Sequence, residues 1–164
     1  MKSIDQETID FAEDFFFKLS DMQLKERMED LKRSQKMVHL QLIDTGKKLH
    51  YGDSRELFWK YCLMVDYCFK NTYGELQMIS SEAISKFFVW RDRIQFEYVI
   101  GDDYIDFEKY YLASGQSEFL AYLHNKIFAS VEENGDGAKE NDTKIMLGVM
   151  TMVFFYQNEI KRME

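Results

Sequence analysis

The chain has 164 residues, 46% of them hydrophobic and 30% charged, and a formal net charge of −8, a composition typical of one globular domain. No run reaches the roughly 18 consecutive apolar residues of a membrane span, and the early acids Asp5 and Glu7 do not fit a signal peptide. We therefore expect a cytoplasmic protein without a membrane segment. Cys62 and Cys68 have neither a redox nor a metal-binding spacing, so we expect reduced core thiols.

Residues 1–52 form the N-terminal region. Its first helix is expected to begin with a capping box at Ser3 and Gln6 and to run to about Leu19. Acidic residues near its start fit the positive end of the helix dipole and a solvated face. These acids are Asp5, Glu7, Asp10, Glu13 and Asp14. The opposite, buried stripe is expected to consist of Ile4, Phe11, Phe15 and Leu19.

Ser20 and Gln23 form a second capping box, after which apolar residues recur at steps of three and four. This pattern predicts one long amphipathic helix that ends at about Leu49. Val38, Leu40 and Leu42 also alternate with polar residues, so a short strand is the alternative for that stretch. Either way, residues 1–52 are expected to consist mainly of N-terminal helices.

Residues 53–164 contain the expected centre of the fold. A capping box at Asp53 opens a helix to about Tyr73 that is apolar on most of its circumference, which is typical of a central helix. Gly74 is a candidate for its C-cap. Further helices are expected from Ser80 or Ser81 to Gly101, from Asp102 or Asp103 to Ala113, and from Ser117 to Val131.

The stretch 132–142 is acidic, polar and glycine-bearing, which predicts a mobile loop. Asn141 or Asp142 is then expected to cap the last helix. The chain as a whole predicts an all-α fold, a compact single-domain bundle of six or seven helices over residues 1–164. We place Leu57–Phe69 and the aromatic-rich Phe87–Tyr111 at its centre, because large rings dominate core energetics.

The sequence has none of the common catalytic or metal-binding patterns. His39, His50 and His124 lack partners at the spacing of zinc or di-iron ligands. The sequence also lacks a nucleophile elbow and a phosphate-binding glycine loop. We therefore expect a protein that is not an enzyme and that needs no metal or cofactor.

Charge is distributed unevenly along the chain. Lys25–Lys60 has nine basic and six acidic residues, a net charge of +3, which leaves −11 for the remainder. Binding to nucleic acid relies on basic groups that neutralise phosphates. Lys47, Lys48 and Arg55 are therefore candidates for support of DNA binding.

One stretch fits a helix-turn-helix, at residues 103–130. A helix at Asp103–Ala113, the turn Ser114–Gln116 and a helix at Ser117–Ser130 have the lengths of that motif, whose second helix enters the major groove. The side chains at the start and along the exposed side of the second helix would then contact bases or phosphates. The candidates are Gln116, Ser117, Asn125 and Lys126.

Aromatic and glycine residues between positions 87 and 115 follow a definite order. It reads Phe87-Phe88, then Phe96-x-Tyr98-x-x-Gly101, then Asp106-x-x-Lys109-Tyr110-Tyr111-Leu112-x-x-Gly115. This order resembles the central signature of the RteC family, and the similarity covers roughly residues 57–164. Members of that family regulate conjugative transposons and are regarded as DNA-binding activators. The resemblance implies a small transcriptional regulator that belongs to a mobile element and binds duplex DNA.

The acidic net charge supports a different hypothesis. A non-enzymatic protein-interaction module, such as an anti-factor or an immunity-type protein, would use an acidic surface to bind a basic protein. A contiguous acidic patch at Asp5–Asp14 and Asp102–Glu108 would favour this hypothesis, whereas a basic stripe beside Gln116–Lys126 would favour DNA. Both hypotheses stay open at the level of the sequence.

Overall fold

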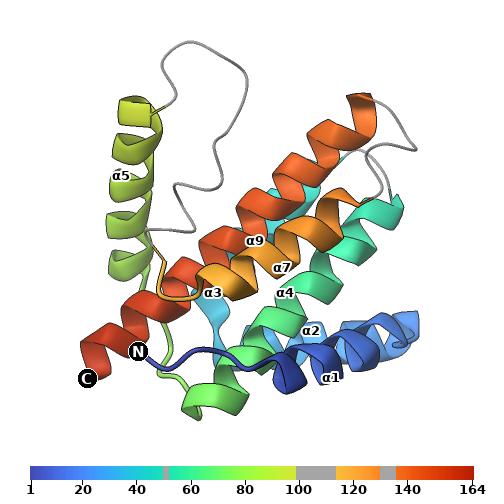
Figure 1. Cartoon of the computed structure of the whole chain (residues 1–164), viewed down its shortest axis with the longest axis horizontal. Coiled ribbons are helices and arrows are strands. Elements are labelled where there is room, and N and C mark those ends of the chain that lie inside the picture. Colours follow the sequence, from blue (N-terminus) through green and yellow to red (C-terminus); the bar gives the residue numbers. More distant parts are fainter. Residues whose placement is uncertain (50–51, 99–113, 130–135) are drawn as a thin grey trace.

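The computed structural model describes residues 1–49, 52–98, 114–129 and 136–164, with side chains except those of 52, 90–98 and 136–139. The described residues form seven helices and no strand (Figure 1). The helices are α1 (Gln6–Phe17), α2 (Asp21–Ser34), α3 (Lys36–Lys47), α4 (Gly52–Tyr73), α5 (Ser81–Tyr98), α7 (Ser117–Phe128) and α9 (Asp136–Met163). The predicted all-α bundle is thereby confirmed.

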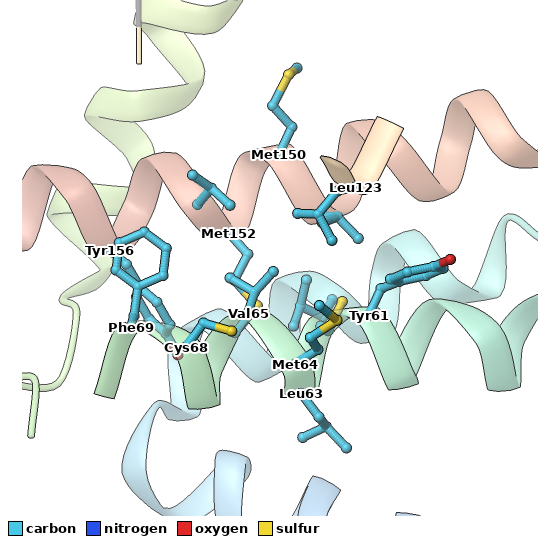
Figure 2. Close-up of a cluster of buried hydrophobic side chains, with 14 of the residues drawn as sticks. Tyr61, Leu63, Met64, Val65, Cys68, Phe69, Leu123, Met150, Met152 and Tyr156 are labelled. Atoms are coloured by element: carbon cyan, nitrogen blue, oxygen red, sulfur yellow. The ribbon is translucent and has the colours of Figure 1, made fainter. Parts of the chain in front are cut away.

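Helices α4 and α9 pack against each other at the centre of the bundle, with α1 and α2 on α4 and with α7 on α9. Figure 2 shows side chains of α4 and α9 interleaved, with Leu123 of α7 beside them. Phe58, Cys62 and Val65 of α4 are fully buried, as are Met152 and Tyr156 of α9. Each large apolar side chain buried in this way contributes about 1.5–3 kcal/mol. The predicted central position of Leu57–Phe69 is confirmed.

The two cysteine thiols are free and buried in this core. Burial raises the pKa of Cys62 well above its ordinary value and that of Cys68 to about 12. Both groups are therefore neutral thiols in contact with apolar side chains. This confirms the expectation of reduced core thiols.

The aromatic segment is central only at its start. Phe87 is buried, and its ring lies 6.0 Å from that of Phe154 and 4.8 Å from that of Phe155 on α9. Val89, two residues later, is 72% exposed. These rings join α5 to the C-terminal half of α9. The rest of the predicted central segment, residues 90–111, lies outside the described side chains, and so does the helix predicted at 102–113.

Helix starts agree with the capping predictions at Ser20 and Ser80. Ser20 and Gln23 form both bonds of a capping box, and the Ser80 hydroxyl accepts a hydrogen bond from the Ala83 N–H at 3.2 Å. The cap of α1 is Asp5 and not Ser3, since the Asp5 carboxylate accepts from the Thr8 N–H at 2.8 Å. Ile4 is buried before this cap, and its contacts keep residues 1–4 out of the helix.

The prediction of one long helix up to Leu49 is wrong, because the helix is interrupted at Gln35, between α2 and α3. The backbone there adopts φ −139° and ψ 61°, outside the helical region. The Gln35 side chain is fully buried and hydrogen-bonds the backbone of residues 76–79. The alternative strand is also wrong, since residues 38–42 lie inside α3.

Two further boundaries differ from the predictions. Helix α4 begins at Gly52, so Asp53 lies in its first turn and is not its N-cap. Helix α9 begins at Asp136, so the part of the predicted loop from 136 to 142 is helical. Asn141 and Asp142 are buried in this helix. Packing against the bundle therefore outweighs the low helix propensity of this polar, glycine-bearing sequence. Helix α4 ends at Tyr73, directly before Gly74, as predicted. Gly74 has φ +84°, the left-handed conformation that is common directly after a helix.

Candidate interaction surface

The second helix of the predicted helix-turn-helix is α7, which begins at Ser117 as expected. Its cap, Gln116, is only 3% exposed. The Gln116 Nε2 donates to the Lys2 carbonyl at 2.8 Å and to the Tyr73 hydroxyl at 2.6 Å, and its Oε1 accepts from the Ile4 N–H at 3.1 Å. The polar atoms of Gln116 therefore hold the N-terminal segment, and this arrangement does not support its predicted role as a DNA contact.

Ser117, Asn125 and Lys126 are exposed on α7. Lys126 Nζ lies 2.9 Å from Glu13 Oε1 of α1 and 5.5 Å from the centre of the Tyr122 ring. The Tyr122 hydroxyl donates to the other Glu13 oxygen at 2.5 Å. Burial raises the pKa of Tyr122, and the charges of Glu13 and Asp10 add to this. The exposed side of α7 thus borders carboxylates, which repel phosphates.

The other DNA-contact candidates lie on different helices. Lys47 and Lys48 are exposed at the end of α3, and Arg55 is exposed near the start of α4. Lys48 pairs with Asp44 at 3.2 Å. The nearby Lys144 donates to the Lys48 carbonyl at 3.4 Å and pairs with Glu140 at 2.7 Å. Carboxylates therefore alternate with the lysines of this area.

Helix α1 presents an acidic face to solvent. Glu7, Asp10 and Asp14 are exposed and are three or four residues apart, which places them on one side of the helix. The opposite side, with Ile9, Ala12 and Phe16, is buried against the bundle. Asp10 accepts from Gln6 Nε2 at 2.7 Å, and Asp14 pairs with Lys18. Four of the five acids predicted for the solvated face are exposed, whereas Glu13 is half-buried and bonded to Tyr122 and Lys126.

An exposed ring lies at the edge of this face. Phe11 is 55% exposed, so its predicted place in the buried stripe of α1 is wrong. Its ring stacks on those of Phe15, at 6.1 Å, and Tyr67, at 5.5 Å. The guanidinium of Arg27 lies over the Phe15 ring, 5.4 Å from its centre. We define the α1 surface as Glu7, Asp10, Phe11 and Asp14.

The sequence contained a signal for the orientation of α1 that the stripe prediction did not use. If Glu7, Asp10 and Asp14 define the outer side, a rotation of half a turn predicts Ile9, Ala12 and Phe16 as the inner side. Threonine at position 8 and alanine at position 12 weaken the apolar pattern on that inner side. The exposed position of Phe11 follows directly from this rotation.

Metal binding and membrane insertion were the remaining possibilities that the described residues can address. They contain no group of three or more His, Cys, Asp or Glu side chains placed to hold a metal ion. None of the helices within the same ranges is long and apolar enough to cross a membrane. Comparisons with protein-family models, with curated proteins and with solved structures found no match.

Proposed function

We propose that the protein is a non-enzymatic interaction module that binds a basic protein through the α1 surface. The observation that carries this proposal is the position of three exposed carboxylates next to a stacked, half-exposed Phe11 ring. Carboxylates attract and orient a basic partner. An exposed aromatic side chain supplies the apolar contact that concentrates binding energy at an interface.

The charge of the whole molecule supports the same partner class. A net charge of −8 repels phosphates and attracts basic proteins from a distance. On α7, the cation that would contact DNA, Lys126, is already paired with Glu13. This arrangement favours the protein-interaction hypothesis over contact of α7 with a DNA groove.

A DNA-binding regulator of the RteC type is the second proposal. It is supported by the exposed Lys47, Lys48 and Arg55 near one end of α3 and the start of α4. In that case phosphates would bind to this end of the bundle, and the exposed Ser117 and Asn125 would be the remaining contacts of α7. The two proposals differ in the polymer that the protein binds and in the helix that binds it.

The test compares two variants with the same change in charge. Glu7→Gln/Asp10→Asn/Asp14→Asn neutralises the α1 surface, and Glu29→Gln/Glu82→Gln/Glu140→Gln neutralises three exposed carboxylates on other helices. Proteins from the source cells are captured on immobilised wild type and on both variants, identified, and then measured as purified partners by calorimetry. We expect a basic partner that the wild type and the control variant bind and that the α1 variant binds at least tenfold more weakly.

Salt supplies a second readout of the same interaction. Exposed charges are screened over about 8–10 Å at 0.1–0.15 M salt, so the affinity for the partner is expected to fall as salt rises. The α1 variant should show a flatter dependence than the control variant. Equal binding of the partner by both variants, with equal salt dependence, would overturn the proposed function.

A further inference from the structure

A cavity of about 380 Å³ lies between α1, α2 and α4, beside the α1 surface. Tyr67 joins the two features, because its ring lines the cavity and also stacks on Phe11. The apolar part of the lining consists of Phe16, Leu31, Leu63 and Tyr67, and the polar part of Arg27, Asp30, Asp66, Lys70, Asn71 and Glu75. The lining therefore combines an apolar wall with five charged side chains.

Two of these charged groups are already committed to each other. Asp66 Oδ2 lies 2.8 Å from Lys70 Nζ, and Asp66 Oδ1 accepts from the Tyr156 hydroxyl at 2.5 Å. Lys70 also donates to the Ser34 hydroxyl at 3.2 Å. This network joins α2, α4 and α9. It leaves neither Asp66 nor Lys70 available to a charged guest without loss of an internal bond.

Among the charged side chains of the lining, the three carboxylates outnumber the two cations. Arg27 Nη1 lies 3.9 Å from Asp30 Oδ2, with its guanidinium over Phe15. Asp30 also pairs with Arg33 at 2.6 Å. Glu75 is exposed, and in the described part of the chain it has no ion pair within 4.0 Å. An entering cation would therefore pair first with Glu75.

Around α1 the chain already holds two of its own cations near rings and carboxylates, one on the side of α2 and one on the side of α7. Arg27 lies between the Phe15 ring and Asp30, and Lys126 lies between the Tyr122 ring and Glu13. A guanidinium suits such a site better than an ammonium, because it is planar, stacks on aromatic rings and is less strongly hydrated. The lining of the cavity likewise includes an aromatic ring, Tyr67, and an exposed carboxylate, Glu75.

We propose that this cavity takes an arginine side chain of the basic partner, with its aliphatic stem along the Tyr67 ring and its guanidinium at Glu75. The proposal rests on the proposed function and names the residue that the partner inserts. The α1 surface then contacts the partner around this anchor. Phe11 connects this surface to the anchor, because it stacks on the Tyr67 ring that lines the cavity.

The first test uses small probes and the full chain. Nα-acetyl-arginine amide is titrated into 15N-labelled protein and followed by NMR, with the lysine and citrulline analogues as comparisons. Citrulline has the shape of arginine without its charge. We expect shifts at the amides of Tyr67, Asn71 and Glu75 that are largest with arginine, smaller with lysine and absent with citrulline. Equal shifts with citrulline, or shifts confined to other helices, would overturn the proposal.

A conservative variant tests the role of the carboxylate. Glu75→Gln is expected to weaken binding of the arginine probe roughly two- to fivefold, the usual range for an exposed ion pair. Glu82→Gln, which neutralises an exposed carboxylate on α5, should leave the probe affinity unchanged. An unchanged affinity in Glu75→Gln would also overturn the proposal.

The purified partner separates the two proposals. If the α1 triple variant loses the partner but Glu75→Gln binds it as tightly as wild type does, the cavity proposal fails and the proposed function stands. If the α1 triple variant keeps the partner, the proposed function fails. In that case the probe titration alone decides whether the cavity binds arginine.

Discussion

Two buried glutamines hold two of the described segments that are not helical. Gln35 binds the backbone of residues 76, 77 and 79, and Gln116 binds the backbone of residues 2 and 4. A glutamine amide has two donor hydrogens and one acceptor oxygen. It can therefore bond both the N–H groups and the carbonyl groups of a non-helical backbone segment. Each amide thus replaces the hydrogen bonds that a helix would have provided.

Substitution of Gln35 tests this role. Gln35→Leu keeps the volume close but leaves the Ile79 N–H and the Gln77 carbonyl without their partner. We expect the free energy of unfolding to fall by about 1–3 kcal/mol, the cost of buried unsatisfied groups. Gln41→Leu, a half-buried position on α3, is the matched control and should change it by about 0.5 kcal/mol or less. Urea denaturation of both variants measures the difference, and equal stabilities would contradict the role of Gln35.

His39 makes stability depend on pH. The side chain is 5% exposed, its ring lies 5.5 Å from that of Trp59, and its Nδ1 has no hydrogen-bond partner within the described residues. Burial lowers the pKa of His39 below its ordinary 6.5, the charge of Lys32 lowers it further, and Glu29 opposes the shift. As pH falls below 6.5, the unfolded state binds the proton first, so the folded state loses stability until the folded pKa is passed.

His39→Phe removes this term while it keeps a ring against Trp59. The loss in the free energy of unfolding between pH 7 and pH 5 is therefore expected to be smaller in His39→Phe than in wild type. Chemical denaturation at both pH values measures it. Part of the loss should persist in the variant, because burial also lowers the pKa of His124. A pH dependence as large as that of wild type would show that the pKa of His39 does not differ between the folded and unfolded states.

Residue-level features could be predicted from sequence where the partner is local. The capping box at Ser20 was predicted because its partner, Gln23, is three residues away. The bonds of Gln35 span 41 to 44 residues, and those of Gln116 to the N-terminal segment span 112 and 114. No pattern in the neighbouring sequence distinguishes these glutamines from exposed ones. The break between α2 and α3 was missed for this reason.

At the scale of elements, α9 packs closely against α3 and α4 at Gly148. A Cβ atom on Gly148 would lie 2.6 Å from a ring carbon of Phe58 and 3.0 Å from the Thr45 methyl carbon. Phe58 is fully buried and has little room to move. Gly46 of α3 also faces Phe58, but a Cβ atom there would lie 3.7 Å away, at ordinary contact distance. The two glycines therefore form a matched pair on one ring.

Alanine substitution should have opposite effects at these two positions. Gly148→Ala overpacks the core, and we expect a loss of about 1–3 kcal/mol, larger than the gain in helix propensity of about 1 kcal/mol. Gly46→Ala should gain up to about 1 kcal/mol from that propensity alone. Thermal and urea unfolding of both variants provides the measurement. A stabilised Gly148→Ala would show that the helices can separate at this crossing at little cost.

Helix type and helix order were predictable because they depend on periodicity within one segment. The apolar circumference of residues 57–69 placed α4 at the centre, and the structure confirms it. The rotation of α1 was wrong at Phe11, since several apolar residues competed for the inner side. The start of α9 was also wrong, because burial of Asn141 and Asp142 depends on helices far away in sequence.

For the whole molecule, net charge was available from the sequence but its spatial arrangement was not. The α1 surface needs the rotation of one helix, and the cavity beside it needs side chains from α1, α2 and α4. No local pattern specifies either feature. The predicted DNA contacts show the same limit, since the burial of Gln116 and the pairing of Lys126 with Glu13 both arise from segments more than one hundred residues away.

Binding to DNA therefore distinguishes the two proposed functions at the scale of the molecule. A protein that neutralises several phosphates loses affinity with a log-log salt slope of about −0.9 per phosphate, and its non-specific dissociation constant is about 10⁻⁴–10⁻⁶ M. For this chain we expect no such binding to a mixed duplex pool between about 50 and 200 mM salt, as measured by fluorescence anisotropy. The net charge of −8 and the acids beside α7 are the reason.

Micromolar binding with a steep slope would instead favour the second proposal, and Lys47→Glu/Lys48→Glu should then weaken the binding to DNA and flatten its salt dependence. If binding were steep but unchanged in that variant, Lys47 and Lys48 would not be phosphate contacts, and the exposed side of α7 would be the surface to substitute next.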